Sequence, residues 1–145
     1  MNAKWDLRFM EMAILVSGWS KDPSTKVGAI ITDDKYVVSV GYNGLPKNYP
    51  ATANEDAILG IKPLKYDVII HGEINALIHA HRRLEGCTLY TYPFPPCSRC
   101  ASIMVEAGIK RVVSGMDIPE RWKENMKLSE DIFNQAGVEI IGVNI

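Results

Sequence analysis

His71-Gly72-Glu73 and, further along, Pro95-Pro96-Cys97-Ser98-Arg99-Cys100 are the two stretches around which the chain is organised. One neutral imidazole and two thiolates are ligands that Zn2+ accepts, and three protein ligands leave the fourth tetrahedral position open for a water. An open position is typical of a catalytic rather than a structural zinc site. We therefore expect His71, Cys97 and Cys100 to bind one zinc ion per chain.

Glu73 is the candidate proton carrier of this site. It stands two residues after His71, too near to be a further ligand without distorting the turn, yet close enough to reach a metal-bound water. Zinc lowers the pKa of its bound water to about 7, so a nearby carboxylate can accept that proton and pass it to a leaving group. A thiol oxidoreductase would also use a Cys-x-x-Cys pair, but it would leave His71 and Glu73 unexplained.

Length and composition restrict the remaining possibilities. The chain has 145 residues, and we expect a single domain over residues 1–145. Apolar residues make up 47% and charged residues 23%, a balance typical of soluble globular proteins. The net charge of −1 disfavours a nucleic-acid partner, and no apolar stretch is long enough for a membrane span. Only Cys87 lies outside the proposed zinc site, which favours a reducing, cytoplasmic location.

Hydrophobic periodicity predicts alternating helices and strands. Helices are expected over residues 4–20, 73–83, 97–107 and 120–136, and strands over 27–32, 37–42, 88–92, 111–114 and 138–143. The first two strands should form a hairpin, and the alternation after residue 71 predicts parallel neighbours with helices on both faces of a five-stranded mixed sheet. Residues 43–66 are expected to form a long polar loop with one helical turn over 55–59.

Several motifs together resemble a known family. His-x-Glu followed by Pro-Cys-x-x-Cys is the signature of zinc-dependent nucleobase deaminases. The stretches 21–29 (KDPSTKVGA), 41–46 (GYNGLP) and 71–76 (HGEINA) are similar to motifs of the deoxycytidylate (dCMP) deaminase family. The resemblance covers most of the chain and is weakest over 47–64 and 116–129. It implies an α/β fold with the three layers of cytidine deaminases.

The resemblance also implies an activity. The reaction would be zinc-dependent hydrolysis of dCMP to dUMP and ammonia, which supplies dUMP for thymidylate synthesis. Glu73 would carry a proton from the water to N3 of the pyrimidine and later help to expel ammonia. Activation by dCTP together with Mg2+, inhibition by dTTP, and a homo-oligomer built from dimers, such as a hexamer, are further expectations from the family.

Candidate substrate contacts lie in or next to these motifs. Backbone N–H groups, hydroxyls and an ammonium at the start of the first strand could hold a monophosphate, an asparagine could meet the sugar 3′-hydroxyl, and two aromatic side chains could wall the pyrimidine. In chain order these residues are Ser24, Thr25, Lys26, Asn43, Tyr92 and Phe94. Each also has a plainer interpretation, because a lysine before a strand is often solvated, Asn-Gly is a common turn, and aromatic residues fill cores.

The family's effector-binding loop corresponds to Gly41, Tyr42, Asn43, Gly44 and Pro46. Two residues past the proline, Asn48 stands where a glycine is expected. Asparagine is the residue other than glycine that best tolerates positive φ, so the turn should survive. Gly72 replaces the commoner alanine. The stretch Tyr92-Pro93-Phe94-Pro95 is bulkier than the usual lead-in to the cysteines, and could alter which substituent at position 5 of the pyrimidine fits.

Other functions remain open at this point. A deaminase of deoxycytidine or of a 5-modified dCMP would share the zinc site, and a nucleoside enzyme would lack the phosphate contacts. An enzyme that edits tRNA or DNA would need a basic face, which the net charge disfavours. A non-catalytic zinc-containing binding module would have no use for Glu73 beside an open metal position.

Overall fold

The computed structural model describes residues 3–51 and 54–145. At its centre lies a five-stranded sheet in the order β2-β1-β3-β4-β5. The strands are β1 (Gly28–Asp33), β2 (Tyr36–Tyr42), β3 (Thr88–Tyr92), β4 (Arg111–Gly115) and β5 (Glu139–Val143). β1 is antiparallel to both β2 and β3, whereas β3, β4 and β5 are mutually parallel. The predicted hairpin and the mixed sheet are therefore confirmed.

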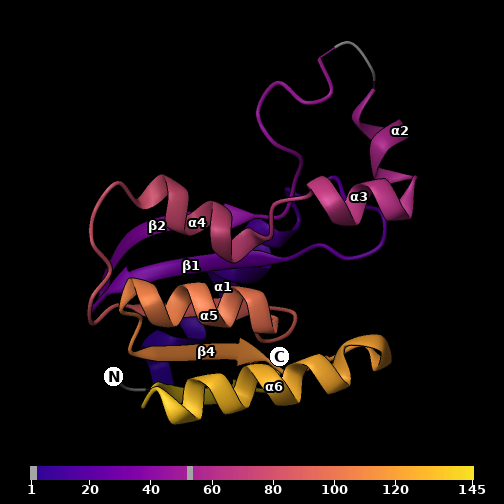
Figure 1. Cartoon of the computed structure of the whole chain (residues 1–145). Coiled ribbons are helices and arrows are strands. Elements are labelled where there is room, and N and C mark those ends of the chain that lie inside the picture. Colours follow the sequence, from indigo (N-terminus) through magenta and orange to yellow (C-terminus); the bar gives the residue numbers. More distant parts are fainter. Residues whose placement is uncertain (1–2, 52–53) are drawn as a thin grey trace.

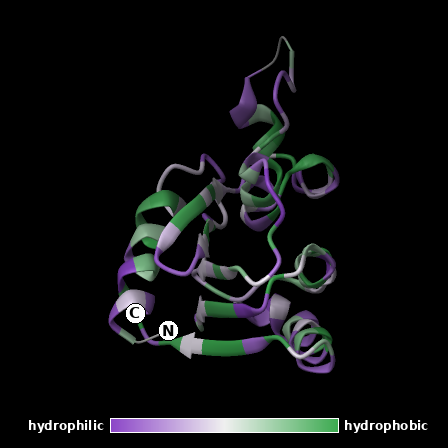
Figure 2. Ribbon diagram, turned by 90° about the vertical axis from the view of Figure 1, so that its left-hand side faces the viewer, coloured by the Kyte–Doolittle hydropathy of each residue, from purple (hydrophilic) through white to green (hydrophobic). Residues whose placement is uncertain are grey.

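Helices cover both faces of the sheet and make three layers (Figures 1 and 2). One face carries α1 (Ala3–Ser17), and the other carries α4 (Gly72–Ala80), α5 (Ser98–Ala107) and α6 (Lys123–Gln135). Successive side chains of a strand point to opposite faces, so each central strand supplies both cores. In β1, Ile30 packs with Phe9 of α1, while Ile31 packs with Leu89 beneath the other three helices.

The N-terminal end of α4 is held close to the sheet by a glycine. A Cβ on Gly41 would lie 2.4 Å from the nitrogen of Ala76 and 2.4 Å from the carbonyl oxygen of Gly72. Only a residue without a side chain allows the helix backbone to approach β2 in this way. This contact fixes the position of the first turn of α4 relative to β2, and therefore the position of His71, which is the N-cap of α4.

An arm formed by residues 45–51 and 54–70 projects from the body between β2 and α4 (Figure 1). The first helix of the arm, α2 (Glu55–Leu59), coincides with the predicted helical turn. The prediction that the loop continues to residue 66 is wrong from Lys62 onward, because α3 (Lys62–Val68) is helical. Pro63 does not interrupt α3, since proline is accepted in the first turn of a helix, where the N–H has no intrahelical partner. Asn48, which stands where a glycine is expected, adopts a φ of 66°, the left-handed conformation that the turn requires.

Smaller differences concern helix ends. α4 ends at Ala80 rather than at residue 83 because His81 adopts a left-handed φ of 55°. α5 ends as expected at Ala107, where Gly108 with a φ of 95° forms the C-cap. A short 3-10 helix, η1 (Glu120–Trp122), precedes α6. Among the helices of the described residues, none is both long and apolar enough to cross a membrane.

Candidate metal centre and substrate pocket

His71, Cys97 and Cys100 meet where α4 and α5 begin. His71 is the N-cap of α4, Cys97 is the N-cap of α5, and Cys100 lies in the first turn of α5. The Nδ1 atom of His71 is 3.5 Å from Cys97 Sγ and 3.3 Å from Cys100 Sγ. All three potential ligand atoms lie within 4.8 Å of one another, and both cysteines are buried. Two sulfurs and one imidazole nitrogen are a donor set that fits Zn2+.

The electrostatics of this cluster favour a cation. Helix N-termini carry partial positive charge, which stabilises thiolate over thiol. The hydrogen bond with Cys100 is the largest of the effects that lower the pKa of Cys97 to about 4, and the hydrogen bond with His71 lowers it further. Burial of the thiol acts in the opposite direction and raises the pKa. The hydrogen bond with Cys97 in turn raises the pKa of Cys100 and that of His71. The lowered pKa favours the thiolate form of Cys97, and a metal ion would replace the proton on Cys100.

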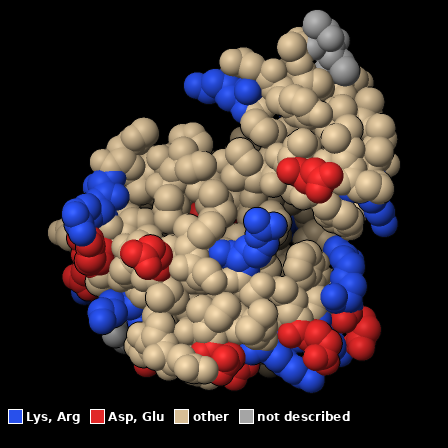
Figure 3. Space-filling model, viewed as in Figure 1, with Lys and Arg blue, Asp and Glu red and all other residues tan. Residues whose placement is uncertain are grey.

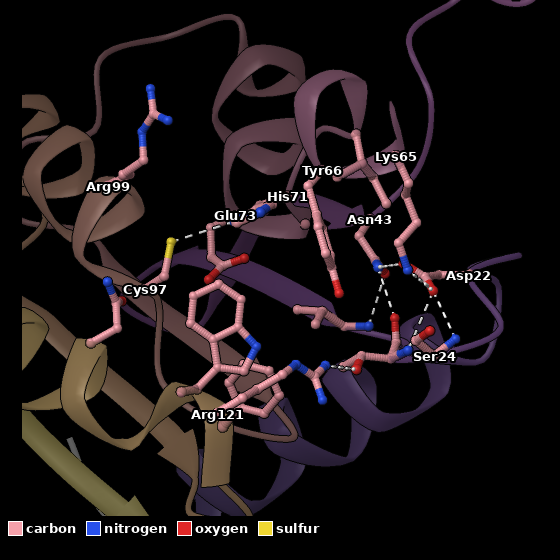
Figure 4. A pocket seen from close by; sticks show the side chains of 17 residues that line it. Asp22, Ser24, Asn43, Lys65, Tyr66, His71, Glu73, Cys97, Arg99 and Arg121 are labelled. Carbon is pink, nitrogen blue, oxygen red and sulfur yellow. Dashed lines mark hydrogen bonds and ion pairs between the residues drawn. The ribbon is translucent and has the colours of Figure 1, made fainter. Parts of the chain in front are cut away.

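Glu73 lies beside the cluster without belonging to it. Its side chain is 4% exposed, and burial raises the pKa of its carboxyl group, partly offset by His71. Figure 4 shows the carboxylate pointing into the pocket on the side where His71 and Cys97 lie. The group is therefore placed to exchange protons with a molecule held next to the metal ligands.

A pocket of about 260 Å³ runs from this cluster to the loop between α1 and β1. His71, Glu73 and Cys97 line one end, and the loop residues Ser24 and Thr25 line the other (Figure 4). Five apolar or aromatic side chains also line the pocket: Val27, Tyr66, Ile69, Phe94 and Trp122. Three of them, Val27, Phe94 and Trp122, belong to the apolar cluster that contains Cys97 and Cys100. The cavity thus has a metal-binding end with apolar walls and a hydroxyl-bearing end.

The predicted substrate contacts fall into two groups. Ser24, Thr25, Asn43 and Phe94 line the pocket, whereas Lys26 and Tyr92 stand outside the set of described residues that line it. The ammonium of Lys26 instead donates a hydrogen bond to the carbonyl oxygen of Ser20. Tyr92 packs on the opposite side of the sheet, with the cluster that contains Phe9. Neither residue is placed for the contact that the sequence suggested.

Asn43 supports the pocket wall through its amide. Its Oδ1 accepts from the N–H of Val27 at 2.9 Å, and its Nδ2 donates to the carbonyl oxygen of Thr25 at 2.8 Å and to Asp22 at 3.3 Å. An amide has two donor hydrogens and one acceptor oxygen, so most of its hydrogen-bonding capacity is used within the protein. Asn43 thus supports the pocket wall, and its contact with a sugar hydroxyl stays a prediction.

The remaining residues of the predicted effector loop lie outside the pocket lining. The ring of Tyr42 is exposed and meets that of Trp19 edge-on at 6.1 Å. Gly44 pairs with Ile70 through two backbone hydrogen bonds, and Pro46 is half-buried at the base of the arm. Gly41 packs under α4 as described above. An effector role for this loop stays a prediction.

Sequence reasoning missed several pocket residues. Lys65 and Tyr66 come from α3, which was expected to be a loop, and Arg121, Trp122 and Asn125 come from the segment where the family resemblance is weakest. Arg121 donates to the Thr25 hydroxyl at 3.1 Å. No motif marks these positions, so only the fold could bring them to the pocket. The pairing of Lys65 with a buried acid also gives no sequence signal, because the two residues are far apart in the chain.

Comparisons with known proteins agree with this geometry. Residues 3–116 match the family model for the cytidine and deoxycytidylate deaminase zinc-binding region. A relative from Aliivibrio fischeri, described as an uncharacterized deaminase in the luxG 3′ region, is 43% identical over 97% of this chain and 94% of its own. Human deoxycytidylate deaminase is 32% identical over 93% of this chain and 77% of its own. The crystal structure of dCMP deaminase from the cyanophage S-TIM5 in complex with dCMP and dUMP superposes with a TM-score of 0.77, at 25% identity and 99% coverage of both chains.

Proposed function

Because the chain belongs to the cytidine and deoxycytidylate deaminase family, we propose that it is a zinc-dependent enzyme that hydrolyses dCMP to dUMP and ammonia. One observation carries the proposal: a single pocket has the metal-ligand set and Glu73 at one end and hydroxyls with a guanidinium at the other. A cytosine nucleotide has the complementary layout, with its amine and its phosphate at opposite ends. The cyanophage relative was crystallised with dCMP and dUMP, which supports this assignment.

The chemistry at the metal end follows from the residues present. His71, Cys97 and Cys100 would hold the zinc ion, which when bound makes a water acidic enough to lose its proton near neutral pH. Glu73 accepts this proton and delivers it to N3 of the pyrimidine, which makes C4 more electrophilic. The oxygen of that water bonds to C4, and its remaining proton passes through Glu73 to the amine, whose bond to C4 then breaks to release ammonia, so the carboxylate is regenerated in each cycle. The burial of Glu73 excludes bulk water from these transfers.

The far end of the pocket suits a phosphate. Arg121 is exposed and donates to the neutral hydroxyl of Thr25, and among residues 3–51 and 54–145 no carboxylate forms an ion pair with it. A guanidinium matches the geometry of phosphate oxygens, and its charge is not neutralised by an acid. Phe94 and Trp122 provide flat apolar walls for the base. These features favour dCMP over deoxycytidine.

The first experiment compares these two substrates. Zinc-loaded protein should decrease the absorbance of cytosine in dCMP, with a kcat/KM for dCMP at least about tenfold above that for deoxycytidine, because a charge-assisted hydrogen bond contributes about 1.5–3 kcal/mol. Glu73→Gln, which keeps the shape but not the proton transfer, should lower kcat by about 10²–10⁴-fold. Equal activity on both substrates would favour a nucleoside deaminase, and no turnover of dCMP would reject the proposal.

Regulation and assembly are proposed on the family resemblance alone. We expect dCTP with Mg2+ to lower KM for dCMP and dTTP to oppose it, which initial rates with each effector would measure. We expect a homo-oligomer built from dimers, such as a hexamer, which sedimentation would reveal. A cytoplasmic location, inferred from the three cysteines, is likewise a proposal.

A further inference from the structure

Lys65 places a buried ammonium group at the pocket. Its side chain is 2% exposed, and its Nζ lies 3.1 Å from Oδ1 of Asp22, whose side chain is 5% exposed. Lys65 belongs to α3 of the arm and Asp22 to the loop between α1 and β1, and both line the pocket. Burial of a charge is unfavourable unless the charge is paired and hydrogen-bonded, so each of these two residues depends on the other.

Asp22 in turn holds the wall of the pocket. Its Oδ1 accepts from the backbone N–H of Ser24 at 2.8 Å and from that of Thr25 at 3.4 Å. Its Oδ2 accepts from Nδ2 of Asn43, at 3.3 Å, and Asn43 also binds the carbonyl oxygen of Thr25. Figure 4 shows Lys65 and Asn43 converging on Asp22 at the end of the pocket where Ser24 lies. The Asp22 carboxylate therefore fixes the backbone of Ser24 and Thr25, and with it the positions of their hydroxyl groups in the pocket.

Two other contacts hold the arm: the backbone pairing of Gly44 with Ile70 where the arm begins and ends, and an exposed ion pair with the loop between α1 and β1. α2 and α3 pack on one another and stand away from the sheet (Figure 1). Gly44 and Ile70 pair at the base of the arm, and Lys21 forms an ion pair with Glu55 at 3.2 Å, with side chains 70% and 46% exposed. The Lys65–Asp22 pair differs from this second ion pair in being buried and in lining the pocket.

We propose that Lys65 is a positioning residue, which acts through Asp22 to fix Ser24 and Thr25 and so sets the affinity for a pyrimidine nucleotide. The inference rests on the proposed function for the identity of the ligand. Loss of the ammonium leaves the Asp22 carboxylate buried without a cation, and the carboxylate then shifts toward solvent or toward other donors. The N–H groups of Ser24 and Thr25 move with it. Glu73 and the metal ligands lie at the other end of the pocket and keep their geometry.

The test compares Lys65→Met with Lys21→Met in the zinc-loaded protein. Lys21 is the matched control, since it links the same loop to the same arm but is exposed. Lys65→Met should raise KM for dCMP and the Kd of dUMP by about tenfold or more while kcat stays within about twofold, because only binding to the wall is altered. Lys21→Met should change neither quantity. Unchanged dUMP binding in Lys65→Met overturns the inference.

A double variant separates positioning from direct contact. In Lys65→Met combined with Asp22→Asn, the amide oxygen can still accept from the N–H of Ser24, and no buried charge remains. The 3.3 Å hydrogen bond from Asn43 to the second oxygen is lost, but Asn43 keeps its shorter bond to the carbonyl oxygen of Thr25. Positioning predicts that dUMP affinity returns to within about threefold of wild type, whereas direct contact between Lys65 and the nucleotide predicts no recovery, which would overturn the inference. This variant also decides the question if Lys65→Met alone does not fold. Failure of the wild-type protein to bind dUMP or to deaminate dCMP would instead reject the proposed function.

Discussion

Cys97 and Cys87 are both buried cysteines, yet their surroundings give them opposite chemistry. Hydrogen bonds with Cys100 and His71 lower the pKa of Cys97 to about 4, whereas burial raises the pKa of Cys87. Thiolate is the form that binds metal and attacks electrophiles. The spacing of the cysteines identified Cys97 and Cys100 as candidate ligands, but the sequence could not show that His71 Nδ1 faces both sulfurs.

Cys97→Ser should reduce bound zinc from one ion per chain to well below one, because a neutral hydroxyl is a much poorer ligand than a thiolate. Cys87→Ser is the matched control, since it removes a buried thiol outside the cluster and should leave the zinc content unchanged. Metal analysis of the purified proteins checks this directly. Full zinc content in Cys97→Ser would show that the ligand assignment is incorrect.

At the scale of elements, a buried ion pair fastens α1 to the sheet. Asp6 of α1 accepts from the hydroxyl of Tyr90 in β3 at 2.8 Å and from Nη1 of Arg111 in β4 at 2.8 Å. Burial alone would raise the pKa of Asp6, but the hydrogen bonds from Arg111 and Tyr90 outweigh it and lower the pKa. Because the folded pKa lies below the unfolded one, the carboxylate stabilises the fold above the unfolded pKa. This stabilisation is lost as the pH falls through the folded pKa.

Asp6→Asn should therefore lower the free energy of unfolding by about 3 kcal/mol near neutral pH and by less at lower pH, where wild type also loses the charge. Thermal melts between about pH 3 and pH 7 would show the two curves converging in acid. Asp33→Asn breaks an exposed pair with Arg82, in which the side chains are 55% and 45% exposed, and should cost less than about 1 kcal/mol. A constant gap between Asp6→Asn and wild type across this range would contradict the linkage.

A second contact between elements holds the cysteine-bearing helix. Oδ1 of Asn125 in α6 accepts from the N–H of Ser98, the first residue of α5, at 2.8 Å, and its Nδ2 donates to the Ser98 hydroxyl at 3.0 Å. This N–H has no partner within its own helix. Asn125 thus acts as a cap supplied by another element, directly after Cys97.

Asn125→Ala should speed the transfer of zinc to a chelator, because the first turn of α5 loses this cap and orients Cys97 less firmly. The free energy of unfolding should fall by about 1 kcal/mol. Asn134→Ala, an exposed position on the same helix, is the control and should change neither quantity. Identical rates of zinc transfer in the two variants would show that Asn125 does not position the ligand.

For the whole molecule, the sequence predicted what short-range patterns encode and missed what depends on long-range contacts. Alternating apolar stretches predicted the five strands and their mixed pairing. The metal ligands were recognisable because the spacing of His71, Cys97 and Cys100 carries a chemical meaning by itself. Lys65 and Arg121 reach the pocket only because the arm and the segment before α6 fold over the same loop. Their residue types, a lysine and an arginine, are equally common on solvated surfaces.

The distribution of apolar clusters predicts how the whole molecule responds to metal removal. The two large clusters on either side of the sheet contain no metal ligand, and Cys97 and Cys100 belong to a smaller third cluster with Phe94 and Met126. Basic and acidic side chains are interspersed on the face shown in Figure 3, so no concentrated charge there opposes folding without the cation.

Chelation should therefore lower Tm while leaving the far-UV circular dichroism of the native protein intact at room temperature. A ligand that binds only the folded state at a thousand times its Kd adds about 4 kcal/mol to the free energy of unfolding, and its removal cancels that increment alone. Thermal melts with and without a chelator, followed by re-addition of zinc to restore Tm, make the measurement. A loss of helical signal on chelation would mean that the metal is needed for the fold itself, and that the large clusters cannot hold the three layers together.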